Sequence, residues 1–305
     1  MSKKVEIVEV GPRDGLQNEK TIVSTEDKVS FIRRAVDAGV KRIEIASFVH
    51  PKLVPQMADA EAVVEQLGEI NGVTRVGLTL NKRGAFRALD CGIDQLGAVC
   101  VATDSFGLKN QNADSAQTVM TANEIVRLGH AEGRSAQVTI STAFGCPFEG
   151  EVSETRVLEI VRKLLESEPT EIALADTIGV AVPNQVFSLV QKASEIVGEV
   201  PIRVHFHNTR NTAIANVWAA VEAGANVIDA SIGGIGGCPF APNATGNVAT
   251  EDVIYMLSRS GVNHGLSFET LLDTAKWLEG VLDKKVPSML AAAGGFPVSE
   301  RSLGR

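Results

Sequence analysis

The sequence has few of the features that would place a protein in a membrane, in an oxidising compartment or on nucleic acid. It contains no run of 18 apolar residues and no apolar stretch behind its first residues, so neither a membrane span nor a secretion signal is predicted. Its four cysteines lack paired metal-binding spacing, which favours free thiols in a reducing compartment. The net charge of -8 argues against nucleic acid as the main partner. We therefore expect a cytoplasmic protein with neither a membrane nor a nucleic-acid partner.

Linkers rich in proline and serine are also lacking, which bounds the domain organisation. A chain of 305 residues, 44% of them hydrophobic, can bury a large core. We expect one catalytic domain over 1–305, with a barrel over about 5–260 and a helical extension over about 261–305.

Short β-branched apolar runs alternate with amphipathic stretches along the chain. Eight such units in one domain predict a closed (β/α)8 TIM barrel of parallel strands rather than an open sheet. No G-x-G-x-x-G follows the first run, which disfavours the open sheet further. The predicted strands are 5–10, 42–47, 75–80, 95–102, 136–143, 171–175, 202–207 and 226–232. The predicted helices include 25–38, 58–68, 248–260 and an additional C-terminal helix near 267–283.

Polar residues fall where such a barrel has its active site, at the carboxyl ends of the strands and in the loops that follow. His205 and His207 are two residues apart on one predicted strand, so both point to one face and can approach one metal ion. They could instead be hydrogen-bonded residues of the barrel, Asp14 could cap a turn, and Asn247 could cap the following helix. The residues predicted to converge are Arg13, Asp14, Glu44, Asp176, His205, His207, Cys238 and Asn247.

Glu44 and Cys238 stand out by their neighbours. A carboxylate among isoleucines needs a partner to be buried, and Arg13 is the expected one. Cys238 lies between two glycines and a proline, which favours exposure over core packing. Of the other cysteines, Cys146 follows a predicted strand and could line the site, whereas Cys91 and Cys100 are expected to be structural.

Five segments follow one another along the chain: GPRDGLQNE at 11–19, SF followed by PKLVPQM within 47–57, GCPFEG at 145–150, ADTIG at 175–179 and GGIGGCPFAPNATGNVATEDVIYML at 233–257. In this order they resemble the 3-hydroxy-3-methylglutaryl-CoA lyase family of metal-dependent barrel lyases. The resemblance implies that Arg13 stabilises an enolate, that Glu44 and Asp176 support the site, and that Cys238 lies on a mobile loop over the substrate. The Mg²⁺ or Mn²⁺ ligands that it implies are Asp14, His205, His207 and Asn247.

The chemistry of carbon–carbon cleavage fits the same residues. Cleaving a 3-hydroxyacyl thioester requires removal of the hydroxyl proton while negative charge builds on the oxygen of the departing acetyl-CoA. A divalent ion held by a single carboxylate keeps positive charge and can serve both needs. We expect Asp14 or His207 to be the base and Cys238 the proton donor, with His205 among the catalytic residues.

An acyl-CoA substrate needs local polar groups on this acidic chain. Lys109 and Asn110, in a predicted loop after the fourth strand, resemble a lysine/asparagine stretch of the family and could bind coenzyme A, although a solvated loop is the alternative. Arg13 and Gln17 are the further expected substrate contacts.

The chain departs from the family after its two histidines. The family commonly has H-x-H-D-T-Y-G-Q, whereas this chain has HFHNTRNT at 205–212, with Asn208 for the acid and Arg210 for the tyrosine. Arg210 could bind a substrate carboxylate or phosphate, or it could face solvent or pair with Glu222. Because of this departure, the alternative is that the protein is a relative of the lyase that acts on another 3-hydroxy-3-carboxymethyl acyl-CoA.

Three other functions compete with the lyase. A condensing synthase of the isopropylmalate or homocitrate type usually carries a further C-terminal region, and only about 20 residues follow the last predicted helix here. A biotin-dependent carboxyltransferase is expected to have a carboxylatable lysine on a central strand, and none is evident. A silent metal-binding barrel would not need Arg13, Glu44 and Cys238 together. The expected assembly is a homodimer or a larger homo-oligomer.

Overall fold

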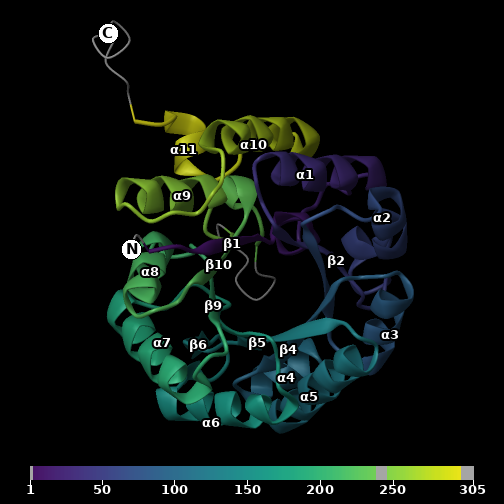
Figure 1. The fold of residues 1–305 in the computed structure, drawn as a ribbon, viewed down its shortest axis with the longest axis vertical. Helices are drawn as coiled ribbons and strands as arrows, with labels where there is room; N and C mark the ends of the chain where they lie inside the picture. Colours follow the sequence, from purple (N-terminus) through teal and green to yellow (C-terminus); the bar gives the residue numbers. More distant parts are fainter. Residues whose placement is uncertain (1–2, 238–245, 297–305) are drawn as a thin grey trace, which may run out of the picture.

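The computed structural model describes residues 3–237 and 246–296, and within them eight parallel strands close into a barrel inside a ring of helices (Figure 1). Around the barrel the order is β1-β10-β9-β8-β5-β4-β3-β2. The predicted (β/α)8 fold is confirmed. The barrel strands are β1 (Glu6–Glu9), β2 (Arg42–Ser47), β3 (Thr74–Thr79), β4 (Gln95–Val101), β5 (Ser135–Ser141), β8 (Ile172–Asp176), β9 (Ile202–Phe206) and β10 (Val227–Ala230).

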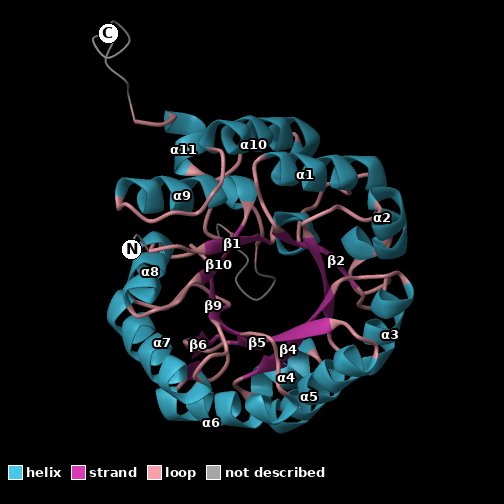
Figure 2. Cartoon of the chain, viewed as in Figure 1, coloured by secondary structure: helices cyan, strands magenta, loops and turns pink. Residues whose placement is uncertain are grey.

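Helices cover the outside of the barrel on all sides (Figure 2). Several of these helices have a serine as their N-cap residue. Ser24, for example, accepts a hydrogen bond from the backbone N–H of Asp27. The helices that follow the strands are α1 (Thr25–Asp37), α2 (Ala60–Leu67), α3 (Lys82–Asp90), α5 (Ser115–Ala131), α6 (Glu154–Leu164), α7 (Pro183–Val197), α8 (Ala213–Glu222) and α9 (Thr250–Arg259). The predicted extra C-terminal helix is α10 (Phe268–Leu282), and a short α11 (Met289–Ala293) follows it.

Three short elements near the carboxyl ends of β4 and β5 were not predicted. The stretch after β4, which the sequence suggested to be a loop, forms helix α4 (Asp104–Asn110), in which the buried Gly107 fits closely against the backbone of Ala113. After β5, strands β6 (Gly145–Cys146) and β7 (Gly150–Glu151) form a small antiparallel hairpin. No helix in the described part of the chain is both long and apolar enough to cross a membrane.

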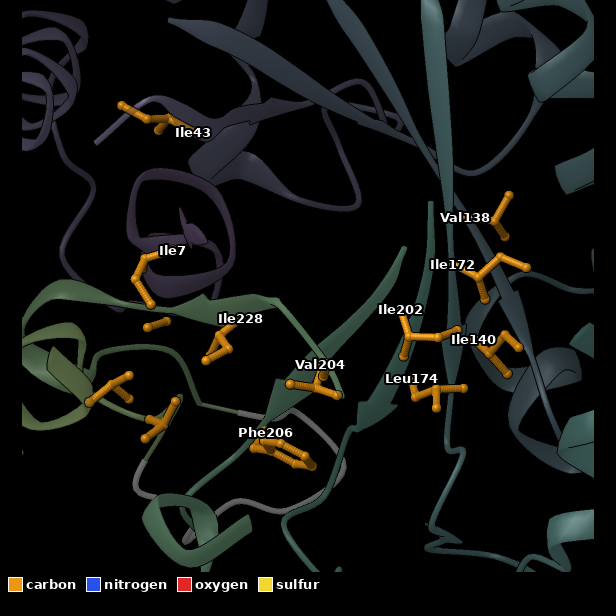
Figure 3. Packing of buried hydrophobic residues seen from close by; sticks show 14 of the residues in the cluster. Ile7, Ile43, Val138, Ile140, Ile172, Leu174, Ile202, Val204, Phe206 and Ile228 are labelled. Atoms are coloured by element: carbon orange, nitrogen blue, oxygen red, sulfur yellow. The ribbon is translucent and has the colours of Figure 1, made fainter. Parts of the chain in front are cut away.

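The strands separate an apolar outer layer from a polar interior. On β9, Val204 and Phe206 pack in the large apolar cluster between strands and helices, with neighbours on β5, β8 and β10 (Figure 3). The alternate residues Arg203 and His205 face the cavity inside the barrel. Because side chains alternate along a strand, a buried apolar layer forces every second residue toward the barrel axis. This alternation places the polar residues of several strands in one space.

Candidate active site and metal centre

Three potential metal ligands lie close together: Asp14, His205 and His207. Asp14 lies in the turn η1 (Gly11–Gly15) after β1, His205 lies in β9, and His207 directly follows that strand. Oδ2 of Asp14 is 3.8 Å from Nε2 of His205 and 3.7 Å from Nε2 of His207. Two atoms bound at about 2.1 Å to one ion lie roughly 3–4 Å apart, so this spacing suits a shared divalent ion.

Asn247 joins this group from the far end of the chain. Its backbone pairs with His207, and its Nδ2 donates a hydrogen bond of 2.8 Å to Oδ2 of Asp14. Its Oδ1 is buried and lacks a hydrogen-bond partner among the described residues. An unpartnered buried oxygen is costly, and an ion beside Asp14 would satisfy it. The residues present therefore fit a site for Mg²⁺ or Mn²⁺ with one carboxylate, two imidazoles and one amide oxygen.

Asn247 does not cap the helix that follows, which was the plain alternative for this residue. Helix α9 begins at Thr250, and its N-cap position is Ala249.

Arg13 connects Asp14 to Glu44, which confirms the predicted partner of the buried Glu44 carboxylate. Its Nη1 donates to Oδ1 of Asp14 at 2.7 Å, while Nε and Nη2 donate to Oε2 of Glu44 at 2.8 and 2.5 Å. Burial raises the pKa of Asp14, but Arg13 and the two histidines outweigh it and hold the pKa well below its usual range. For Glu44 burial outweighs Arg13, so its pKa is raised. The Asp14 carboxylate is thus kept ionised, as a metal ligand must be.

A cavity of about 250 Å³ opens beside this cluster. Its apolar wall includes Leu53, Leu78, Leu80 and Val99. The predicted substrate contacts Gln17 and Asn110 also line it. The other polar residues that line it include Arg13, Asp14, Glu44, Thr139, His205, His207, Arg203 and Asp229.

Asp176 is buried at the end of β8, but its carboxylate is turned toward its own loop. It accepts hydrogen bonds from the backbone N–H groups of Val180 and Ala181, each at 2.9 Å. Burial raises its pKa, although both N–H groups oppose the rise. The backbone N–H of His207 donates to the Asp176 carbonyl at 3.3 Å. This geometry suits the predicted supporting role better than contact with a substrate.

Two predicted contacts lie away from the cavity. Lys109 is exposed, and its Nζ lies 3.8 Å from the centre of the Phe148 ring. Arg210 is also exposed, and its Nη1 donates hydrogen bonds of 3.0 Å to the carbonyls of Ile178 and Gly179. Neither residue is among those that line the cavity. The structure thus gives no support to the expected direct contact of Arg210 with an acyl group.

The proposed partner of Arg210 is also engaged elsewhere, since Glu222 forms an ion pair of 2.6 Å with Lys3.

The cysteines divide as follows. Cys238 lies outside the described residues, so its role stays a prediction; the preceding Gly237 lines the cavity. Cys146 is buried, accepts a hydrogen bond of 3.1 Å from Thr103 Oγ1, and does not line the cavity. Burial raises the pKa of Cys100 to about 12, which fits an inert core thiol. Cys91 is half-buried, outside the cavity.

Arg203 and Asp229, which lie beside His205, were not predicted from the sequence. Arg203 Nη1 donates to both carboxylate oxygens of Asp229, and Nδ1 of His205 lies 3.1 Å from Asp229 Oδ2. Burial raises the pKa of Asp229, but Arg203 and His205 outweigh it and lower the pKa below its ordinary value. Two features of the sequence could have indicated these residues: Arg203 shares the strand face of His205, and Asp229 is a lone acid in the apolar run VIDA.

The closed barrel and its cluster of carboxylate, imidazole and amide groups define a barrel protein with a candidate metal site at the carboxyl ends of its strands. The HMGL-like family model matches residues 4–278, and the chain belongs to this family. It is 39% identical over 286 residues to hydroxymethylglutaryl-CoA lyase of Bacillus subtilis, which covers 94% of this chain and 96% of the relative.

Two further relatives bear on the substrate. The chain is 38% identical over 300 residues to (R)-citramalyl-CoA lyase of Chloroflexus aurantiacus, covering 95% of each protein. A solved structure of an HMG-CoA lyase from Acinetobacter baumannii, in complex with coenzyme A and 3-methylmalate, superposes with a TM-score of 0.92. It is 37% identical and covers 97% of this chain and 98% of that one. These relatives are all named as acyl-CoA lyases, in agreement with the predicted enzyme class.

Proposed function

We propose that this protein is a divalent-metal-dependent carbon–carbon lyase for a 3-hydroxyacyl-CoA of the 3-hydroxy-3-methylglutaryl type. It would release acetyl-CoA and a keto acid, which is acetoacetate for 3-hydroxy-3-methylglutaryl-CoA. The observation that carries the proposal is a group of potential metal ligands: Asp14, His205 and His207 line one cavity with Arg13, and Asn247 is hydrogen-bonded to Asp14 beside them. The activities for which the relatives are named support the same reaction.

The residues around the cavity would have different roles in the reaction. When bound, Mg²⁺ or Mn²⁺ would lower the pKa of a substrate hydroxyl and offset negative charge on neighbouring oxygens. Arg13 places a second positive charge at the cavity wall, and its bonds to Asp14 and Glu44 fix its direction. That charge can stabilise an enolate oxygen. The low pKa of Asp14 makes it a weak proton acceptor, which favours its role as a ligand.

A second substrate has support from one relative. (R)-Citramalyl-CoA is named as the substrate of a protein 38% identical to this chain over nearly its whole length. The same bond cleavage there would give acetyl-CoA and pyruvate. The cavity lining does not favour one of these two thioesters over the other, because Arg210, the main departure from the family pattern, does not line the cavity.

One assay separates these possibilities. Purified protein is treated with chelator, dialysed, and incubated with either thioester, with and without Mg²⁺ or Mn²⁺, while acetyl-CoA and the keto acid are measured. We expect release of acetyl-CoA only with added ion, and the preferred thioester identifies the acyl group. No release from any 3-hydroxyacyl-CoA in the presence of either ion would refute the lyase. Sedimentation of the same sample tests the predicted homo-oligomer.

A further inference from the structure

Asp229 and Arg203 form a buried pair directly behind His205. In the register between β10 and β9, Asp229 lies opposite His205, and Arg203 is two residues before His205 on the same face. Both pair members are 3% exposed. The pair therefore contacts the candidate metal site from inside the barrel, on the side away from Asp14.

The two nitrogens of His205 face different partners. Nε2 lies 3.8 Å from Oδ2 of Asp14, whereas Nδ1 lies 3.1 Å from Oδ2 of Asp229. An ionised carboxylate can only accept hydrogen bonds, so Nδ1 must carry the proton of this contact. In the neutral ring the lone pair then lies on Nε2, toward Asp14. The contact with Asp229 thus selects the tautomer that a metal ion requires.

Arg203 holds Asp229 in the ionised form and in one orientation. Its Nη1 lies 2.7 and 2.6 Å from the two oxygens of Asp229. Its Nη2 donates to Gln137 Oε1 and, at 3.1 Å, to Thr139 Oγ1, while Nε lies 2.7 Å from Glu171 Oε1. The guanidinium is thereby tied to β5, β10 and the residue that precedes β8. A carboxylate paired in this way can neither rotate nor take up a proton at low cost.

We propose that Asp229, held by Arg203, is a positioning residue that fixes the tautomer and ring orientation of His205 for metal binding. The inference rests on the proposed metal-dependent function. It assigns to Asp229 no contact with the substrate. Partners that orient metal-bound histidines commonly change metal affinity by roughly 10–100-fold when they are removed.

The test compares Asp229→Asn with wild type in two measurements. Calorimetric titration of chelator-treated protein with Mn²⁺ should show roughly 10–100-fold weaker binding in the variant. Nitrogen NMR of ¹⁵N-histidine-labelled, metal-free protein, at a pH where the ring is neutral, should show His205 protonated at Nδ1 in wild type. In the variant we expect a shift toward the Nε2-protonated form, because the Asn side chain can donate to Nδ1. A His205→Gln variant assigns the signal.

Asp94→Asn is the matched control. Asp94 accepts hydrogen bonds of 2.8 and 2.9 Å from Nε and Nη2 of Arg75, so the same exchange removes an arginine–aspartate pair outside the cavity. It should leave both the Mn²⁺ affinity and the His205 tautomer unchanged. If Asp229→Asn does not fold, the double variant with Arg203→Gln removes both charges together and should show the same loss of affinity.

Three results would overturn the inference. The first is a folded Asp229→Asn variant that binds Mn²⁺ within twofold of the wild-type affinity. The second is a loss of Mn²⁺ affinity in Asp94→Asn as large as that in Asp229→Asn. The third is a wild-type protein in which His205 is protonated at Nε2. A wild-type protein that binds no Mn²⁺ while His205 is protonated at Nδ1 would instead refute the proposed metal-dependent function, and the metal-binding role of Asp229 with it.

Discussion

Arg210 donates a hydrogen bond of 3.0 Å to the carbonyl oxygen of Gly179, and this contact joins the loops that follow β8 and β9. The two loops are tightly packed, since Gly179 has φ +62° and a Cβ there would lie 2.7 Å from the carbonyl oxygen of His207. Asp176 binds the next N–H groups of the same loop from inside. Arg210 therefore holds the loop beside a candidate metal ligand without reaching the cavity.

We expect Arg210→Tyr to lower kcat/KM for 3-hydroxy-3-methylglutaryl-CoA and (R)-citramalyl-CoA by the same factor. The lost hydrogen bonds to two carbonyls should also lower the free energy of unfolding by about 1–2 kcal/mol. Steady-state kinetics on both thioesters and urea unfolding measure these effects. Arg83→Tyr, on the exposed side of α3, is the control and should change neither. A changed preference between the two substrates would mean that Arg210 contributes to recognition of the acyl group.

Local patterns predicted most of the fold, because alternation of apolar residues is a property of neighbouring positions. The two-residue spacing predicted for the same reason that His205 in β9 and His207, directly after it, point to one face. Helix α4 was missed because Gly107 and the asparagines near it favour a loop locally, whereas in the folded chain Gly107 packs against the backbone of Ala113 and Phe106 against Val101 and Cys146.

Contacts between distant strands could not be predicted in the same way. Asp229 orients His205 only because β10 is paired with β9 in one register, which the apolar run VIDA does not specify. The direction of a side chain in a loop is similarly undetermined, and so Arg210 was expected at the cavity but binds a neighbouring loop.

Removal of divalent ions should abolish acetyl-CoA release, and Mg²⁺ or Mn²⁺ should restore it. Asp14→Ala and His207→Ala should each weaken Mn²⁺ binding by at least about tenfold, because each removes a proposed ligand. Calorimetry on chelator-treated protein measures this. Asp252→Ala serves as the control, since Asp252 binds Ser288 and the start of α11 instead. Full activity in excess chelator would contradict metal dependence.

Cys238→Ser should lower kcat by roughly 10²-fold or more while leaving Mn²⁺ affinity nearly unchanged, if this thiol delivers a proton to the acetyl-CoA enolate. Cys91→Ser, at a half-buried position outside the cavity, should have little effect. Single-turnover kinetics and calorimetry separate the two quantities. Equal, large losses in both variants would show that the thiol at 238 has a structural role.

Two buried carboxyls behind the glycine-rich turn at 232–234 should make the stability fall as the pH rises. Glu9 accepts hydrogen bonds from the backbone N–H groups of Gly11 and Ile232, and Glu251 accepts one from Gly233. Burial raises the pKa of Glu9 to about 8 and that of Glu251 to about 7, from 4.5. Between pH 4.5 and these values the folded chain keeps protons that the unfolded chain has lost. The free energy of unfolding therefore decreases across this window.

Glu9→Gln should remove a large part of this dependence, because the amide cannot ionise. We expect the free energy of unfolding of wild type to fall between pH 5.5 and pH 8, and that of Glu9→Gln to fall less, by about one to a few kcal/mol. Urea unfolding at both pH values measures the difference. Glu159→Gln, at an exposed position of α6, should keep the slope of wild type. An unchanged slope in Glu9→Gln would mean that the Glu9 carboxyl is already ionised in the folded protein at pH 5.5.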